Sequence, residues 1–475
     1  MNPSGVQPAV SVVVNTCNRA APLRTCLAAL RHQTYGNFEV VVINGPSTDD
    51  TEAVIRANPD VKAGHCPELN LSKSRNIGIA MAAGDYVAFI DDDGVAEPTW
   101  VEELVRCMGR ASHVAAAGGY TKDPSGVTFQ AKRIVCDRLS NGQICDFSYV
   151  PQYPHAFRFP APIGCNCMFR KDALLQIGAF DEQYDYFLDE TDVCARLIDA
   201  GYTVDFTPRA SMIHKFAKSH LRDQRRVMRD WSKIVKNTVY YIRQYESALD
   251  REACDRVLAE KVAAIRRLIK AQAFQGDFTA EEALEIDKTV DAGLEQGRRD
   301  CARGTRLLIS EETLTVHRKP FKPFLRRGGD AKPLTIVFLA GAYPPVCQKA
   351  VALAGTGQNI HVIVPGDLPV DTVEFEEEVW VHRITFKDYP NHLLERDTVA
   401  CDFPTDRLKR LYSYYEELLK IEERIHVDVV ETPIPGDLGF YPSLDSRFKA
   451  IVVPQACSGQ EVSPAYYRKV MEESF

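Results

Sequence analysis

The sequence lacks the segments that place a chain in or across a membrane. No run approaches the roughly 18 to 20 consecutive apolar residues of a transmembrane helix. The first residues have neither the basic start nor the long apolar core of a secretory signal peptide. We therefore expect a cytoplasmic protein, with any membrane contact peripheral and at the inner face.

The spacing typical of a structural zinc site is also missing, although the chain has 14 cysteines. Most of them lie in apolar segments, where a thiol packs as a small hydrophobic group, and a cytoplasmic protein keeps its thiols reduced. Cys165 and Cys167 form an isolated CxC pair with no second Cys or His pair at zinc spacing. A zinc site at this pair is therefore the less favoured interpretation.

An excess of positive charge is absent as well. The formal net charge is -8, which gives no reason to expect nucleic acid as the main partner. There is no internal repeat and no low-complexity tract, and a hydrophobic content of 45% is typical of folded soluble proteins. The length of 475 residues predicts two or three domains.

Short apolar runs rich in β-branched residues alternate with helical patterns over the first 120 residues. Strand, helix and strand in repetition predict parallel crossovers and a doubly wound α/β sheet. Ligands bind such sheets beyond the carboxyl ends of the strands. The predicted strands are "AVSVVV", "FEVVVI" and "DYVAFI".

Three consecutive acids, Asp91, Asp92 and Asp93, follow the last of these runs. Alternation along a strand predicts that Asp91 and Asp93 face one side and Asp92 the other. Two convergent carboxylates suit a hard divalent cation, Mg²⁺ or Mn²⁺, whose charge would relieve their repulsion. The alternative is a solvated acidic turn, but the position after a buried parallel strand favours the metal.

A second acidic group, Asp185, Asp189, Glu190 and Asp192, lies at the start of a predicted helix. Asp192 can complement the helix dipole and pair with Arg196 one turn on. Asp189 and Glu190 add more negative charge than is needed to complement the dipole of one helix. A carboxylate near a metal-bound phosphate could remove a proton from an attacking hydroxyl, as a general base does.

Two further residues are candidates for the same site. His214 follows an apparent strand and could be a third metal ligand, although a lone His is more often structural. Gly164 permits a close backbone approach to a bound sugar.

The residue composition and the predicted structure change several times over the rest of the chain. Residues 121–165 hold many turn formers and aromatics and predict an irregular excursion around a cleft. Residues 215–243 interleave basic and aromatic side chains, which suits a solvated helix, a nucleic-acid surface or a membrane-surface helix. A charged helical segment, a linker and a second α/β pattern follow. The predicted domains are 1–220, a helical segment with linker at 221–330, and 331–475.

Several ordered motifs between about residues 9 and 217 resemble the family-2 glycosyltransferases, which have the GT-A fold. They are "VSVVVNTCNRAAPLRTCLAALRHQTYGNFEVVVI", "LSKSRNIGIAMAAGDYVAFIDDD", "GCNCMFRKDALLQIGAFDE" and "DETDVCARLIDAGY". The resemblance implies a GT-A domain with a mixed, mainly parallel sheet. It also implies a metal-dependent, inverting transfer from a nucleotide-sugar donor to a glycan or lipid-linked glycan acceptor in polysaccharide biosynthesis.

The resemblance assigns roles to residues by their motif positions. Asp91 and Asp93 match the acids that hold the metal and the donor, and His214 matches a histidine that is a metal ligand in some members. Asp189 and Glu190 match the catalytic acid pair, with Glu190 as the base. The residues implied near the donor are Thr16, Asn18, Arg19, Asn44, Arg75, Asp91, Asp92 and Gly164.

One departure concerns the donor. Many members have two acids after the second strand, where this chain has Asn44 and Gly45, so uridine should not be assumed as the base. Because acceptors in this family are often lipid-linked, we also expect peripheral contact of residues 215–243 with anionic lipid.

Residues 331–475 resemble, more weakly, the N-terminal half of a family-4 GT-B glycosyltransferase, a Rossmann-like partial domain. The half that usually grips the nucleotide is missing, so we predict no independent catalysis there.

Two rival functions differ from this assignment. One is a non-catalytic scaffold that binds sugar nucleotides or glycans. The other is a sugar nucleotidyltransferase, which the absence of a glycine-rich, lysine-bearing phosphate loop near the start disfavours.

Overall fold

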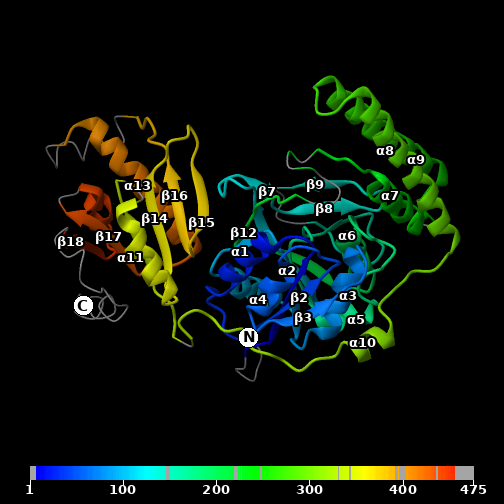
Figure 1. The fold of residues 1–475 in the computed structure, drawn as a ribbon, viewed down its shortest axis with the longest axis horizontal. Helices are drawn as coiled ribbons and strands as arrows, with labels where there is room; N and C mark the ends of the chain where they lie inside the picture. The colour runs from blue at the N-terminus through cyan, green and yellow to red at the C-terminus, as the bar shows by residue number, and fades with distance from the viewer. Residues whose placement is uncertain are drawn as a thin grey trace.

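The computed structural model contains two large β-sheets with helices packed on them, a small three-stranded sheet, and a helical hairpin that projects from the first large sheet (Figure 1). Its described residues are 7–145, 150–218, 223, 225, 227–246, 249–329, 331–341, 344–390, 394, 403–434 and 437–454. Within these ranges no helix is both long and apolar enough to cross a membrane. The predicted domain boundaries remain predictions.

The first sheet runs in the order β3-β2-β1-β4-β11-β6-β12-β5, with β7 paired to β6. Strands β3, β2, β1 and β4 are parallel, and β11 is antiparallel to both of its neighbours, β4 and β6. The mixed, mainly parallel α/β sheet that the sequence predicts is therefore confirmed. The strands are β1 (Val10–Thr16), β2 (Phe38–Asn44), β3 (Lys62–His65), β4 (Tyr86–Asp91), β5 (Gly94–Ala96), β6 (Val114–Lys122), β7 (Phe129–Ala131), β11 (Asn166–Arg170) and β12 (Thr203–His214).

Helices cover both faces of this sheet because its strands carry apolar side chains on both sides. Val12 belongs to the cluster with Leu27 and Trp100, whereas the next residue, Val13, packs on the other face with Ile77. Such doubly buried strands read as continuous apolar runs. The helices are α1 (Ala20–Leu30), α2 (Thr51–Arg56), α3 (Leu71–Met81), α4 (Trp100–Met108), α5 (Lys171–Gln176) and α6 (Asp189–Asp199).

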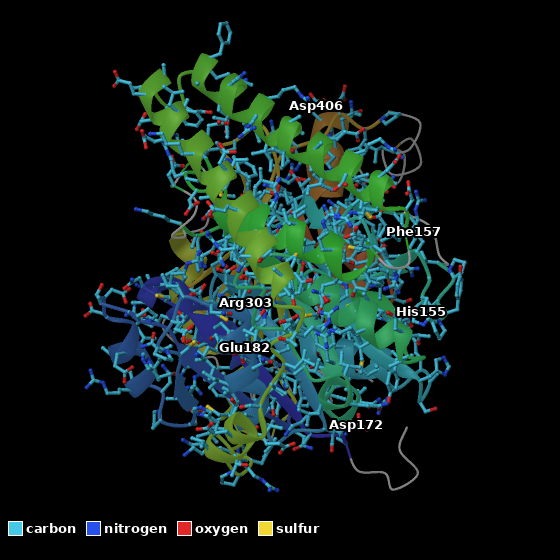
Figure 2. The ribbon with its side chains drawn as sticks, turned by 90° about the vertical axis from the view of Figure 1, so that its right-hand side faces the viewer. His155, Phe157, Asp172, Glu182, Arg303 and Asp406 are labelled. Atoms are coloured by element: carbon cyan, nitrogen blue, oxygen red, sulfur yellow. The ribbon has the colours of Figure 1, made fainter. Side chains whose placement is uncertain are left out.

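The excursion predicted at 121–165 contains a small antiparallel sheet in the order β10-β8-β9. Its strands are β8 (Ile134–Asp137), β9 (Gly142–Ile144) and β10 (Arg158–Pro160). His155 and Phe157 are exposed on this excursion (Figure 2). Residues 146–149 lie outside the described residues.

The segment after the first sheet is helical, as predicted. Helix α7 (Ser232–Gln244) packs on α9 (Ala280–Ala302), which forms a hairpin with α8 (Arg251–Phe274), and α10 (Glu311–Val316) follows. Both views show the hairpin rising from the body of the protein (Figures 1 and 2). Thr279 and Glu282 form a capping box that starts α9.

The interleaved basic and aromatic pattern at 215–243 does not form one exposed face. Tyr240 and Tyr241 are buried on α7, and Arg229 pairs with Asp223 at 3.0 Å. Positions 219–222, 224 and 226 lie outside the described residues. Contact of this segment with anionic lipid stays a prediction.

The second sheet runs in the order β15-β16-β14-β13-β17-β18 and is parallel except at its edge strand β15. Its resemblance to half of a GT-B enzyme stays a prediction, and residues 455–475 lie outside the described residues. The elements are β13 (Thr335–Leu339), α11 (Pro344–Gly355), β14 (Asn359–Pro365), β15 (Thr372–Glu376), β16 (Val379–Ile384), α13 (Thr405–Arg424), β17 (Val429–Ile434), η2 (Asp437–Gly439), α14 (Phe440–Leu444) and β18 (Ala450–Pro454).

The edge of the second sheet packs against the first. Val373 and Trp380 form a buried cluster with Val95 and Ile213, and the backbone N–H of Val373 donates to the carbonyl of Ser125 at 2.7 Å. Ile213 directly precedes His214. The second sheet therefore supports the strand end that carries one candidate metal ligand.

Replacing Gly126 by alanine tests this contact. Gly126 has φ +73°, and a Cβ there would lie 2.3 Å from the carbonyl oxygen of Val373. Gly201 has φ +86° but no atom within 4 Å of its Cβ position, so Gly201→Ala adds only backbone strain, about 1 to 2 kcal/mol. We expect a larger fall in melting temperature for Gly126→Ala, measured by calorimetry. Equal losses in the two variants would contradict the described packing of β15.

Candidate active site

The three acids lie where β4 ends, between β1 and β11. Asp91 and Asp93 both face the imidazole of His214, whose Nε2 lies 3.9 Å from Oδ2 of Asp91 and 3.2 Å from Oδ1 of Asp93. Asp92 instead accepts a hydrogen bond from Arg19 at 2.7 Å. Asp91 and Asp93 thus share His214, whereas Asp92 pairs with Arg19, which also lies 3.8 Å from Asp93.

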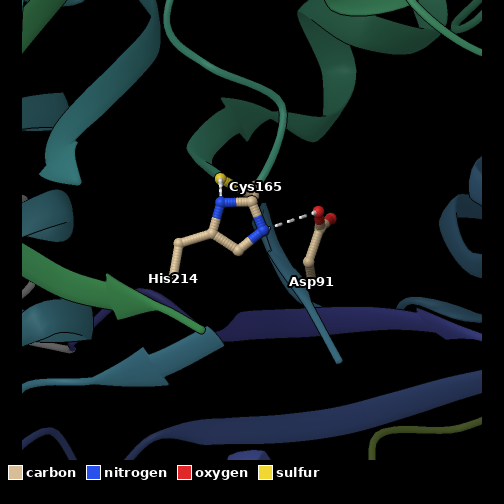
Figure 3. Close-up of side chains that lie close together, drawn as sticks. All are labelled: Asp91, Cys165 and His214. Carbon is tan, nitrogen blue, oxygen red and sulfur yellow. Dashed lines mark hydrogen bonds and ion pairs between the residues drawn. The ribbon is translucent and has the colours of Figure 1, made fainter. Parts of the chain in front are cut away.

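His214 also contacts Gln130 and, as Figure 3 shows, Cys165. Its Nδ1 lies 2.9 Å from Oε1 of Gln130 and 3.9 Å from Sγ of Cys165. One possible ligand atom from each of Asp91, Cys165 and His214 lies within 4.8 Å of the other two. Apart from its ion pair with His214, the buried Oδ1 of Asp93 has no hydrogen-bond partner among the described residues.

The electrostatics of this cluster favour a positive charge. Burial raises the pKa of Asp92 to about 7, despite the opposing effect of Arg19. Burial would lower the pKa of His214, but the neighbouring Cys165 and Asp93 raise it to about 11. The cluster therefore favours a positive charge at the imidazole of His214, which a bound metal ion would replace. The carboxylate, imidazole and thiol groups of the cluster fit a divalent metal ion, and Oδ1 of Asp93 has no partner other than His214 among the described residues.

Arg19 connects the acids to the segment after β12. Its Nε and Nη2 donate to the carbonyls of Lys218 and Ala217, both at 3.0 Å. The N–H of Ala217 in turn donates to Oδ2 of Asp93 at 2.6 Å. The side chain predicted to lie along the nucleotide thus holds residues 217–218 against the acids.

Three other residues predicted near the donor lie at the ends of β1 and β2. Thr16 is buried at the end of β1, and the side-chain oxygen of Asn18 accepts from the backbone N–H of Thr48 at 2.7 Å. Asn44 accepts from the hydroxyl of Ser47 at 2.7 Å. The two loops are therefore joined into one wall beside the acids.

The second acid group is anchored by a buried ion pair. Arg75, on α3, pairs with Asp189 at the start of α6, and both side chains are buried. Nη2 of Arg75 also donates to the carbonyl of Gly164 at 3.1 Å. A Cβ at Gly164 would lie 2.7 Å from this guanidinium, so the space left by the glycine is filled by Arg75.

Glu190 differs from Asp189 because it has no arginine partner of its own in the described structure and is only half-buried. Burial and the adjacent Asp189 raise the pKa of Glu190 to about 8, and Arg75 opposes this effect. A partly exposed carboxylate with a raised pKa is suited to proton transfer near neutral pH.

A strained turn fixes the position of these acids. Phe187 and Leu188 have φ of 76° and 66°, a left-handed conformation that non-glycine residues rarely adopt. Asn237, on α7, donates to the carbonyls of Tyr186 and Phe187. Backbone strain of this kind is maintained by surrounding contacts and clusters at functional sites.

Some acids near the site have structural partners. Asp192 pairs with Arg196 at 2.8 Å, as predicted, and also with Arg306. Asp185 pairs with Lys236 at 2.8 Å. Gln130 and Asn237 carry no motif that marks them in the sequence, and Cys165 has no second cysteine pair that would indicate a zinc site.

The buried ion pair of Arg75 and Asp189 makes a prediction about stability. Arg75→Met leaves a buried carboxylate without its partner, and we expect a loss of about 3 to 5 kcal/mol in the free energy of unfolding. The double variant Arg75→Met, Asp189→Leu should regain much of this loss. Urea titration measures both.

Lys288→Met is the control for this measurement. Lys288 forms an exposed ion pair with Glu285 at 2.5 Å, and its loss should cost less than about 1 kcal/mol. If Arg75→Met costs no more than this control, Arg75 does not anchor α6.

The comparisons with known proteins agree with the motifs. Residues 11–178 match the model of glycosyl transferase family 2. A putative glycosyltransferase, EpsH, of Bacillus subtilis is 37% identical over 106 residues, 22% of this chain and 31% of that protein. A glucosyl-dolichyl phosphate glucuronosyltransferase of Haloferax volcanii is 28% identical over 227 residues, 43% of this chain and 69% of that protein.

Solved structures are also similar. The mannosyltransferase PcManGT from Pyrobaculum calidifontis, in complex with GDP-Man and Mn²⁺, has a TM-score of 0.39 and 16% identity, over 62% of this chain and 88% of that one. The chain spans 31% to 44% of the length of the first three curated relatives it matches. Over residues 11–178, the sequence resembles that of the family-2 glycosyltransferases.

Proposed function

We propose that the unit built on the first sheet transfers a glycosyl group from a nucleotide-sugar donor to a hydroxyl of a glycan or lipid-linked glycan, with inversion. The observation that carries the proposal is the link between the two acid groups. The carbonyl of Gly164 binds Arg75, which holds Asp189, while the next residue, Cys165, contacts His214. The candidate metal ligands and the candidate base are thereby connected through the adjacent residues Gly164 and Cys165.

Asp91, Asp93 and His214 would hold a divalent ion, Mn²⁺ or Mg²⁺. When bound, the ion would neutralise the negative charge that develops on the departing nucleoside diphosphate. The wall formed by Thr16, Asn18 and Asn44 lies at the carboxyl ends of β1 and β2, where the nucleotide is expected in an open α/β sheet.

Glu190 would take the proton from the acceptor hydroxyl. For inversion, the attacking oxygen must approach from the side of the sugar opposite the diphosphate. The half-buried position of Glu190 allows an acceptor to reach its carboxylate, whereas Asp189 is enclosed with Arg75. Asp189 therefore acts as a positioning residue that also raises the pKa of Glu190.

Glu190→Gln tests the assignment of the base. We expect turnover to fall by about 10²- to 10⁴-fold, the usual contribution of positioned proton transfer. Product and nucleoside diphosphate release would be measured with UDP-, GDP-, dTDP- and CDP-sugars in the presence of Mn²⁺. Melting temperature with each donor reports binding separately.

Glu182→Gln is the matched control. Burial also raises the pKa of Glu182, but its carboxylate accepts a hydrogen bond from Asn76 and is outside the acid pair. If donors stabilise Glu190→Gln and its product yield equals that of Glu182→Gln, Glu190 is not the base. Equal turnover in both variants then means that the protein uses another base, and no product in either means that it is a binding scaffold.

The raised pKa of Glu190 predicts the pH dependence. The titratable groups that interact with this carboxyl are Asp189, Arg75 and the buried thiols of Cys136, Cys167 and Cys194. Only the ionised form accepts a proton, so kcat/KM should rise about tenfold per pH unit up to about pH 8 and then level off. A profile that is flat from about pH 6 to about pH 8 would exclude Glu190 as the base.

A further inference from the structure

The thiol of Cys165 lies beside the candidate metal ligands, although carboxylates and an imidazole alone would satisfy the proposed site. Its Sγ is 3.9 Å from Nδ1 of His214, and Nε2 of the same ring is 3.9 Å from Asp91 (Figure 3). The three groups come from different strands or strand ends. Cys165 itself is buried, with 3% of its surface exposed.

The sheet register brings these groups together. In the antiparallel pair of β11 and β4, Asn166 lies opposite Ile90, so the residue before Asn166 adjoins the residue after Ile90. These residues are Cys165 and Asp91. On the other side, β12 ends at His214, which pairs with Gly94 of β5 just beyond the acids. The arrangement is therefore part of the fold.

The spacing suits a metal ion bound by oxygen, nitrogen and sulfur. Metal–ligand bonds of about 2.0 to 2.3 Å around a tetrahedral ion place the ligand atoms about 3.3 to 3.7 Å apart. The atoms of Asp91, Cys165 and His214 lie within 4.8 Å of one another. Because Sγ of Cys165 contacts Nδ1 and the acids contact Nε2, the His214 ring must rotate to turn one nitrogen toward both the thiol and the acids. Oδ1 of Asp93 lies 3.2 Å from Nε2 of His214, has no other partner among the described residues, and is a fourth ligand atom within reach.

We propose that Cys165 is a ligand of the divalent ion held by Asp91, Asp93 and His214, and that its thiolate makes the site prefer thiophilic ions such as Co²⁺, Zn²⁺ and Cd²⁺ over Mg²⁺. The inference rests on the proposed function, because it concerns the same ion. On binding, a metal–sulfur bond replaces the S–H bond and the proton passes to solvent, without oxidation. Thiolate is a soft ligand, whereas carboxylate and water suit Mg²⁺.

Titration of the full-length protein with Co²⁺ tests the proposal without an activity assay. A bound thiolate produces an intense sulfur-to-cobalt charge-transfer absorption, which oxygen and nitrogen ligands do not. We expect this absorption in the wild-type protein and its loss in Cys165→Ser and Cys165→Ala. Loss of a residue that only hydrogen-bonds to a metal ligand usually lowers metal affinity by roughly 10- to 100-fold. Loss of a direct ligand should lower Cd²⁺ affinity by at least this much, while Mg²⁺ affinity changes little.

Cys167→Ser is the matched control. Cys167 is equally buried and two residues away, but its thiol lies near the carbonyl of Gly164 at 3.6 Å and packs in the opposite hydrophobic cluster. This variant should keep the cobalt absorption. Asp91→Asn should lose it, because the same ion needs both residues.

Two results would overturn the inference. One is a wild-type protein that binds Co²⁺ without the charge-transfer absorption, a result that needs no variant to fold. The other is an absorption or a Cd²⁺ to Mg²⁺ preference that survives in both Cys165 variants. If glycosyl transfer then still requires Asp91 and a divalent ion, the proposed function stands and only the role of the thiol fails. If no divalent ion binds, the metal-dependent function fails as well.

Discussion

The buried contact of Arg75 with Asp189 and Gly164 is the constraint on which the candidate site depends. A buried guanidinium packed against the rings of Phe89 and Phe180 can remain charged only if its partners are fixed. Those partners come from the start of α6 and from the turn before β11. Because one cation must satisfy both, the turn that carries Cys165 and the helix that carries Glu190 cannot shift independently.

This constraint explains why the residue at 164 is glycine. Any side chain there would meet the guanidinium at 2.7 Å, which would expel Arg75 or displace the turn. The sequence motif suggested space for a sugar at this position. In the structure this space is filled by the guanidinium of Arg75, which packs against Gly164.

Much of the first sheet could be predicted because its central strands are buried on both faces. β1, β2 and β4 read as unbroken apolar runs in the sequence, and periodicity is enough to find them. β3 could not be found in this way, since Lys62, Gly64 and His65 have neither β-branched side chains nor alternation. Its strand conformation comes from pairing with β2 at the sheet edge, which is a tertiary effect.

The candidate site was predictable only where its residues belong to local motifs. The acids after β4 and at the start of α6 stand out in the sequence, whereas the partner of Arg75 lies 114 residues further along the chain. The cluster around His214 draws on β4, β7 and the turn before β11, and no spacing rule connects these positions. Cys165 resembled half of a zinc motif, but its neighbours in space are a carboxylate and an imidazole.

The three adjacent acids are accommodated because each has a different environment. Asp92 faces Arg19, Asp93 accepts a hydrogen bond from the N–H of Ala217, and the side chain of Asp91 is 39% exposed. Repulsion is therefore balanced by a guanidinium, a backbone dipole and the imidazole of His214. Arg19 and Asp93 both hold the backbone at Ala217, so the acids also fix the segment that follows β12. A cation added between Asp91 and His214 would complete this balance without disturbing the contacts of Asp92.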